Sequence, residues 1–319
     1  LTGVTDTVSP FNTFLGNLAG DSATGSGTNN VAIGNEALKA NTTGDNNFAL
    51  GYRALWVNTA GLSNVALGRL ALQSNTASEN VAVGSRALYV NTTGTLNVAV
   101  GVECMDDNTT GQNNTAVGTL ALQKNDTASN NTAIGKEALE RNVTGGNNTA
   151  VGFQALENST ATGNTALGYL AGDTTTSGAN NTILGASAAA SSATVSNEIT
   201  LGNSSIATLR CQVTTITSLS DRRDKDNITD LSAGLDFVNK LRPVAFDWNM
   251  RDGGKVGQAD TGFIAQDLQT AQEITGIDIP DLVYAVNPEK LEAGYGKLIP
   301  VLVKAIQELS AEIEALKSK

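Results

Sequence analysis

A short pattern of polar, apolar and glycine positions recurs along residues 12–202. Each copy runs from asparagine through a variable residue, alanine and an aliphatic residue to glycine, as in NVAIG. The residue before the glycine is Leu, Ile or Val in all twelve copies, and the residue two before it is Ala in nine. Asn lies four residues before the glycine in eleven copies, and Glu198 is the exception. Successive glycines are mostly 17 residues apart, and they are Gly16, Gly34, Gly51, Gly68, Gly84, Gly101, Gly118, Gly135, Gly152, Gly168, Gly185 and Gly202.

A fixed period of this size predicts a solenoid. The β-branched stretch before each glycine predicts a short strand, and turns such as NTTG and NVTG supply Asn and Gly where positive φ is needed. A coil of about 17 residues has room for two short strands and two turns. Each coil adds about 4.8 Å, so the stack is expected to be roughly 50 Å long. Identical residues then lie above one another, with an aliphatic ladder and Asn side chains hydrogen-bonded along the stack.

Two other interpretations compete with the solenoid. Stretches such as NEALKAN and KEALERN are good helix formers, but seven residues between turns are too few for a stable independent helix. One helical turn per repeat stays open. Asn-x-Thr triplets match the pattern of glycosylation acceptors, but their strict register with the repeat favours a role in turns.

Composition limits the range of partners. The net charge of −11 argues against binding to nucleic acid, which needs clustered Lys and Arg. No run of 18 apolar residues exists, so no membrane insertion is expected. Aromatic residues make up only 4% of the chain, and a thin coil of Ala and β-branched residues buries little surface alone. Side-by-side packing of several such rods is therefore expected.

The chemistry available to the chain is narrow. Histidine is absent, which removes Ser-His-Asp catalysis and imidazole metal ligands. Cys104 and Cys211 lack metal-type spacing and are expected to be small buried hydrophobes. No metal or cofactor is expected. The first residues, LTGVTDTVSP, lack both Met and a signal-peptide pattern, which favours a fragment or a processed product.

Composition changes at Ser220. Residues 1–219 hold 14 acidic and 8 basic side chains, whereas 220–319 hold 17 and 12 in less than half the length. The predicted organisation is a lead-in over 1–11, a solenoid shaft over 12–205, a linker over 206–219 and a small α+β domain over 220–319. In that domain Leu231, Leu235, Val238 and Leu241 have helical spacing up to Pro243, VAFDWN alternates like a strand, and TGFIAQDL indicates a strand or turn before a helix.

The last element, a helix over 298–317, carries a heptad seam. Its apolar residues alternate in steps of four and three, which is typical of a coiled coil and indicates self-association. Ile at a with Leu at d would by itself favour a dimer. The seam residues are Ile299, Leu302, Ile306, Leu309, Ile313 and Leu316.

The repeats resemble known families. The NNVAIG coils are similar to the heads of trimeric autotransporter adhesins, which are left-handed parallel β-rolls, and still more to NNTAIG arrays in phage and bacterial tail-fibre proteins. This resemblance implies a mainly β fold in which a trimeric parallel β-solenoid precedes the α+β domain and its coiled-coil helix. A trimer is predicted despite the dimer preference of the seam, because shaft and helix must share one symmetry.

The C-terminal blocks SDRRDKDNI, LDFVNKLRPVAFDWN, TGFIAQDL and YGKLIPVLVKAIQEL resemble the intramolecular chaperone domain of tail spikes, endosialidases and tail fibres. Such domains trimerise, guide folding of the preceding stalk and cut themselves off with a Ser–Lys dyad. The resemblance implies Ser220 as nucleophile, Lys225 as base, and Leu219–Ser220 as the scissile bond. Asp221, Arg223 and Ile228 are the supporting motif residues implied.

Physical chemistry both supports and opposes cutting at this site. A neutral lysine can take the hydroxyl proton, and Arg222 and Arg223 favour its loss of charge. Asp224, which stands where the family often has an aliphatic residue, and Asp226 hold the ammonium charged. A solvated charged linker is the competing interpretation of the stretch.

Together these observations predict a trimeric structural or adhesive fibre of a phage tail or related injection machine, located on the virion. At most it is a single-turnover serine endopeptidase acting on itself. A bacterial surface adhesin with the same modules is the alternative. The expected partners are two further copies of the chain and a host receptor or glycan.

Overall fold

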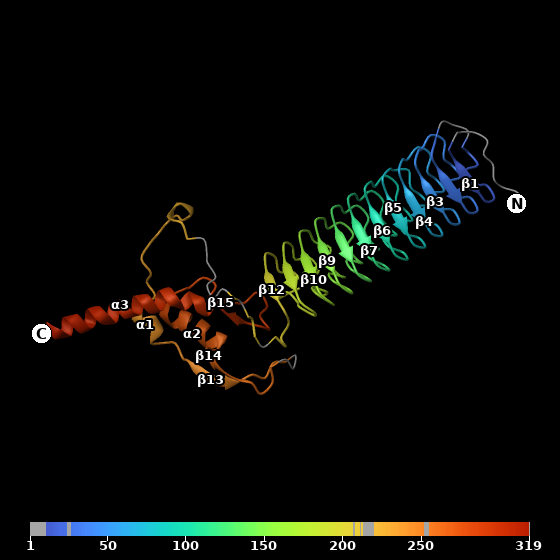
Figure 1. Cartoon of the computed structure of the whole chain (residues 1–319). Coiled ribbons are helices and arrows are strands. Elements are labelled where there is room, and N and C mark those ends of the chain that lie inside the picture. Colours follow the sequence, from blue (N-terminus) through green and yellow to red (C-terminus); the bar gives the residue numbers. More distant parts are fainter. Residues whose placement is uncertain are drawn as a thin grey trace. The chain divides into compact units, whose positions relative to one another are not determined.

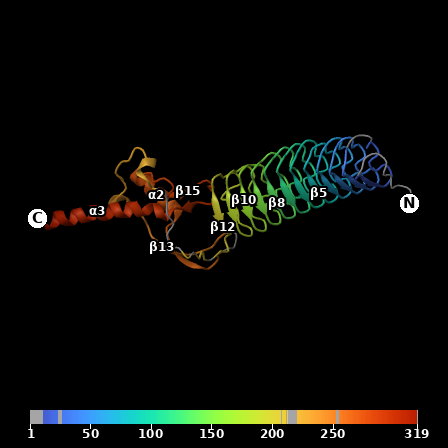
Figure 2. The same cartoon turned by 45° about the horizontal axis from the view of Figure 1, so that its top comes forward.

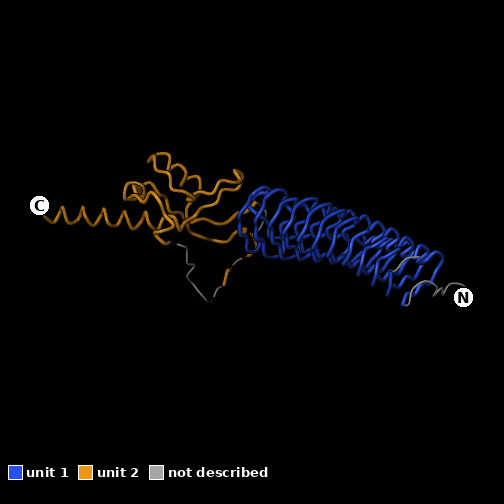
Figure 3. Tube along the Cα trace, turned by 90° about the horizontal axis from the view of Figure 1, so that it is seen from above, with its two compact units in different colours: residues 1–203 blue, residues 204–319 orange. Residues whose placement is uncertain are grey.

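The structure is a computed structural model, and it describes residues 11–23, 27–206, 208–210, 212, 220–251 and 255–318. The chain divides into two compact units, Leu1–Asn203 and Ser204–Lys319 (Figure 3). Each unit has its own cluster of buried apolar residues.

The N-terminal unit is a parallel β-solenoid. Twelve three-residue strands form one sheet in strict sequence order, and every neighbouring pair is parallel. Figures 1 and 2 show the strands stacked one after another, with a loop returning from each strand to the next. The predicted parallel solenoid of about 17-residue coils is thus confirmed. The strands are β1 (Thr13–Leu15), β2 (Val31–Ile33), β3 (Phe48–Leu50), β4 (Val65–Leu67), β5 (Val81–Val83), β6 (Val98–Val100), β7 (Thr115–Val117), β8 (Thr132–Ile134), β9 (Thr149–Val151), β10 (Thr165–Leu167), β11 (Thr182–Leu184) and β12 (Ile199–Leu201).

The core of each coil is narrow and built from small side chains. In β2 the central Ala32 is fully buried, whereas Val31 and Ile33 on either side remain partly exposed. After the glycine that ends the strand, Ala37 and Leu38 are fully buried against it. Because successive side chains of a strand point to opposite faces, the Ala faces the inside of the coil and its aliphatic neighbours face outward.

Each described coil has one strand, although its length has room for two. The segment after the glycine turns through left-handed residues, such as Glu36 at φ 56° and Leu38 at φ 51°. Its backbone still bonds along the stack, since the Leu38 amide donates to the Ala54 carbonyl at 2.9 Å. The one-turn helix that was left open is also absent from the described coils.

The repeated glycine has two independent causes. At Gly118, φ is +140°, a conformation that only glycine adopts readily. A Cβ at this position would overlap the carbonyl oxygen of Gly135 in the next coil. The glycine column therefore lets successive backbones approach closely at one corner of the stack.

Two ladders of buried asparagines run through the coils. In the first, the Asn97 side-chain oxygen accepts the Asn114 amide at 3.0 Å, and its Nδ2 donates to the Gly111 carbonyl at 2.8 Å. In the second, Asn108 Nδ2 donates to Asn91 Oδ1 at 2.7 Å. The expected hydrogen bonding along the stack is confirmed. Asn91 and Asn108 belong to Asn-x-Thr triplets and are fully buried, so they serve the turn and offer no surface to a glycan.

The C-terminal unit is a small α+β region that ends in a long helix, as predicted. β13 pairs antiparallel with β14, and β15 pairs antiparallel with β16. Phe237, Leu268, Leu282 and Val301 form the centre of its buried cluster. The elements are η1 (Arg222–Asp224), α1 (Leu235–Val238), β13 (Val244–Asp247), β14 (Ala259–Gly262), α2 (Ala265–Thr275), β15 (Val283–Tyr284), β16 (Glu292–Ala293), η2 (Tyr295–Lys297) and α3 (Leu298–Lys317).

The first helix of this unit is shorter than its apolar spacing suggests. Leu231 lies outside it, and the helix begins only at Leu235, whose amide donates to the Glu308 carboxylate at 2.7 Å. This contact gives an unpaired amide of the first turn a partner from α3. The element is therefore defined by a distant side chain as well as by local spacing.

Candidate functional site

The residues around Ser220 bring the expected nucleophile and base together. Lys225 Nζ donates to Ser220 Oγ at 2.6 Å. Leu219, the residue on the other side of the expected scissile bond, lies outside the described residues, as does Cys211. Both Ser220 and Lys225 are exposed in the single chain.

The short helix η1 between the two residues creates this contact. Asp221 caps it by accepting the Arg223 amide at 2.9 Å, and the Arg223 guanidinium donates back to the same carboxylate at 2.6 Å. The hydrogen bonds from the Arg223 side chain, followed by that from its backbone, lower the pKa of Asp221. The turn that η1 makes reverses the chain, so that residue 225 lies beside residue 220. Ile228 remains 55% exposed after the turn.

A serine hydroxyl bonded to a lysine amine is the minimal pair for acyl transfer without histidine. In the contact seen here the amine is the donor, so it must first lose a proton to act as a base. Asp224 and Asp226 are exposed near the pair, as are Arg222 and Arg223. Burial of the pair would favour the neutral amine, and the single chain leaves it in solvent.

The heptad seam of α3 faces solvent. Its six residues are between 43% and 68% exposed. A neighbouring strip of the same helix packs into the unit through Leu298, Val301 and Ala305, all nearly buried. The helix thus has a filled face and an apolar face without a partner among the described residues.

A second exposed apolar surface follows the shaft. The aliphatic residue before each glycine faces outward, and none of the twelve is buried. Leu167 is 53% exposed and Leu201 54%. We call these residues the aliphatic column: Leu15, Ile33, Leu50, Leu67, Val83, Val100, Val117, Ile134, Val151, Leu167, Leu184 and Leu201. The repeat pattern indicated such a ladder, and the structure adds that it lies on the outside of the coil.

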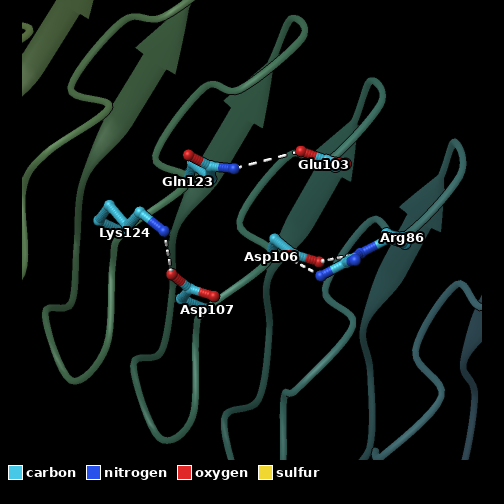
Figure 4. Close-up of polar contacts among 6 residues, drawn as sticks. All are labelled: Arg86, Glu103, Asp106, Asp107, Gln123 and Lys124. Carbon is cyan, nitrogen blue, oxygen red and sulfur yellow. Dashed lines mark hydrogen bonds and ion pairs between the residues drawn. The ribbon is translucent and has the colours of Figure 1, made fainter.

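Charged side chains join neighbouring coils (Figure 4). Arg86 forms a two-pronged pair with Asp106, with contacts of 3.2 and 2.7 Å. Lys124 donates to Asp107 at 2.8 Å, and Gln123 donates to Glu103 at 3.3 Å. Partial burial raises the pKa of Asp106, and its bonds to Arg86 oppose that shift.

The same coil contains the buried thiol. Cys104 takes the place of the usual Ala after the glycine and is fully buried, as expected. Burial raises the pKa of this thiol to about 12. It is therefore an inert packing residue at neutral pH.

Comparison with known proteins finds a family match within the C-terminal unit. Residues 220–284 match the peptidase family described as Chaperone of endosialidase. The match begins at Ser220, the first residue of the pair described above. Residues 220–284 are thus similar to a chaperone-of-endosialidase domain.

Two curated relatives are similar to part of the chain. The long tail fiber protein Gp37 of Enterobacteria phage K3 is 32% identical over 104 residues, which are 31% of this chain and 8% of that protein. The Gp37 protein of Enterobacteria phage T2 is also 32% identical over 104 residues, or 7% of its length. The chain thus spans less than a tenth of the curated relatives it matches. No solved structure matches.

The described residues contain neither a membrane-spanning helix nor a metal-binding cluster. None of their helices is long and apolar enough to cross a membrane. No group of three or more Cys, Asp or Glu within the described ranges is arranged to hold a metal ion.

Proposed function

We propose that this chain forms a homotrimeric fibre whose C-terminal domain assembles it, guides folding of the shaft and then cuts itself off. The shaft is residues 12–205, the linker 206–219 and the chaperone domain 220–319. The cut falls between Leu219 and Ser220. The similarity of the chain to phage long tail fibres supports a place on the virion and a role in host attachment.

The observation that carries the proposal is the Ser220–Lys225 contact at the first residue of the family match. Ser220 Oγ attacks the Leu219 carbonyl carbon while Lys225 Nζ, in its neutral form, takes the hydroxyl proton. The same nitrogen returns that proton to the leaving amine of Ser220. Water then hydrolyses the resulting ester, leaving a shaft that ends in the Leu219 carboxylate. No cofactor is needed.

Assembly supplies what the single chain lacks. The exposed seam of α3 and the aliphatic column of the shaft both need apolar partners. A second and a third copy would cover them. Packing of the copies near the pair would also bury Lys225 and favour its neutral form. Cutting is then restricted to chains that have already assembled.

A repetitive shaft also explains why a separate chaperone is useful. If two chains are shifted by one coil, apolar residues still contact apolar residues, so the wrong register is not excluded. Parallel β structures also assemble slowly and expose strand edges while they do so. A trimer of the C-terminal domain fixes the register from one end. Its removal afterwards closes the route back, so the fibre is held by kinetic stability.

A surface adhesin of a bacterium would use the same modules. The similarity to phage long tail fibres favours the virion. The longer gene separates the two: a membrane anchor belongs to an adhesin, and a virion-attachment domain belongs to a tail fibre.

The test is the intact mass of wild type beside Ser220→Ala, Lys225→Ala and Ser218→Ala. Wild type and Ser218→Ala should each give two pieces split between Leu219 and Ser220, while the other two variants stay whole. The serine two residues upstream is the matched control for a change in local sequence. If wild type stays whole as a trimer, the domain is a permanent cap and the catalytic roles of Ser220 and Lys225 are wrong.

A further inference from the structure

A group of arginine and aromatic side chains lies on three adjacent coils of the shaft. The Arg53 guanidinium lies 5.1 Å from the ring centre of Tyr52 and 4.9 Å from that of Trp56. The Arg86 guanidinium lies 4.7 Å from the ring centre of Tyr89. All five residues follow the glycine of their coil, whereas the aliphatic column precedes it. The group therefore occupies other positions of the repeat than the column that we assign to trimer packing.

The repeat places these residues in columns. Tyr52 and Arg69 each follow their glycine by one residue, and Trp56 and Tyr89 each follow theirs by five. Backbone bonds fix the register, since the Leu70 amide donates to the Tyr52 carbonyl at 2.9 Å. We call Tyr52, Arg53, Trp56, Arg69, Arg86 and Tyr89 the arginine–aromatic patch.

The patch carries positive charge in an acidic protein. Residues 46–102 contain three arginines and a single acid, Glu79, but Glu36 and Asp106 outside this range pair with Arg53 and Arg86, so the uncompensated charge of the patch is that of Arg69. The Arg53 guanidinium is paired with the Glu36 carboxylate. The Arg86 guanidinium is paired with the Asp106 carboxylate at 2.7 Å (Figure 4). These two ion pairs hold the guanidiniums over the rings.

Arg69 lies between the two anchored arginines and differs from both. It is exposed, and among the described residues no carboxylate pairs with it. Tyr52 beside it is 42% exposed. A purely structural role accounts for the cation–π contacts of Arg53 and Arg86, but it leaves Arg69 without a function.

We propose that the arginine–aromatic patch binds an acidic polysaccharide. Aromatic rings present apolar faces to sugar rings, and a guanidinium binds a carboxylate through two parallel hydrogen bonds. Trp56 and Tyr89 are two coils apart, about 10 Å along the stack. Two linked sugars can lie along that span, with a carboxylate on Arg69. The inference goes beyond the proposed fibre, and neither trimer formation nor self-cleavage is needed for its test.

A second cluster on the same columns provides a contrast. The Phe153 and Tyr169 rings stack 5.4 Å apart, with Lys136 Nζ 5.6 Å from the centre of the Phe153 ring. Here Lys136 is paired with Glu137 at 2.9 Å, and Glu157 lies in the following coil. The cluster has no unpaired cation to receive an anionic sugar, so Lys136→Ala is a matched control for Arg69→Ala.

The experiment uses the fluorescence of Trp56. The chain has two tryptophans, so a full-length Trp248→Phe protein leaves Trp56 as the reporter inside the patch. It is titrated with polygalacturonate, with neutral dextran and with polyglutamate. We expect a saturable change with polygalacturonate alone. Arg69→Ala should weaken it about tenfold or more, because the charge-assisted contact with the carboxylate is lost, while Lys136→Ala leaves it unchanged.

Three results would overturn the proposal. One is the absence of a saturable change with polygalacturonate in a protein whose circular dichroism is unaltered. Another is an equal response to polyglutamate, which would show attraction of any polyanion. The third is unchanged affinity in Arg69→Ala, which would place the sugar elsewhere on the chain.

Discussion

Single residues of the shaft are constrained by what lies directly above and below them. Gly118→Ala introduces a Cβ that overlaps the Gly135 carbonyl, at a φ of +140° that alanine does not tolerate. We expect a loss of about 2 kcal/mol or more in the free energy of unfolding. Chemical denaturation measures the loss. Gly163→Asn is the control and should be nearly neutral, because its φ of +72° suits a position that holds Asn in other coils and a Cβ there would meet nothing closer than 3.7 Å.

The asparagine ladder gives a second residue-level prediction. Asn97→Ala removes the acceptor of the Asn114 amide and the donor to the Gly111 carbonyl, both inside the coil. The Gly111 carbonyl still accepts from Asn108 Nδ2 at 3.1 Å, so the Asn114 amide is the group left orphaned, and the variant should lose about 1–3 kcal/mol. Asn113→Ser changes the exposed neighbour to the residue found at Ser63 and should have little effect in the same denaturation series. Equal stability of the two variants would contradict a structural role for the ladder.

The ion pairs between coils predict how stability changes with pH. Hydrogen bonds from Arg53 and then Lys39 lower the pKa of Glu36 from its ordinary 4.5. A lowered folded-state pKa adds stability above pH 4.5 that is lost as the pH falls through the lowered value. Glu36→Gln should therefore melt at a lower temperature than wild type near pH 7. The difference should shrink as the pH falls below 4.5 and vanish once it lies below the lowered pKa of Glu36. A constant difference across that range would mean that packing, not charge, is responsible.

At the scale of elements, periodicity decided what could be predicted. The strand before each glycine and the asparagine ladder could be predicted, because a fixed repeat length stacks identical residues in successive coils. The segment after the glycine could not be predicted, because Glu36 and Leu38 are ordinary residues held in left-handed conformations by bonds to neighbouring coils. The length of helix α1 was overestimated for a related reason, because the residue at which it begins depends on a hydrogen bond to Glu308, 73 residues away in sequence.

Some of the candidate functional residues could be predicted from the sequence, and others could not. The resemblance of the SDRRDKDNI stretch to a known motif singled out Ser220 and Lys225, and the turn of η1 brings them to 2.6 Å. Their catalytic roles remain a prediction. The arginine–aromatic patch was not anticipated, because Tyr52, Arg69 and Tyr89 occupy variable positions of the repeat. The signal that could have found them is the 17-residue spacing itself, which stacks variable positions as strictly as invariant ones.

Helix α3 has two adjoining apolar strips, and among the described residues only one of them packs into the unit. Leu298, Val301 and Ala305 fill the core of the unit, while Ile306 and Leu309 on the seam are 66% and 45% exposed. Substitution on the seam should thus disturb association without disturbing the fold of the unit. Substitution of Val301 should disturb both.

At the scale of the whole molecule, assembly and cutting should be inseparable. Ile306→Asp with Leu309→Asp places two charges on the seam, which should prevent the copies from associating. The variant should be monomeric by light scattering, and it should remain uncut, because the Ser220–Lys225 pair is left in solvent. Glu312→Gln, which changes charge beside the seam, is the control and should assemble and cut as wild type does. A monomer cut between Leu219 and Ser220 would show that the pair is active in a single chain, and burial by neighbouring copies would no longer be needed to explain its chemistry.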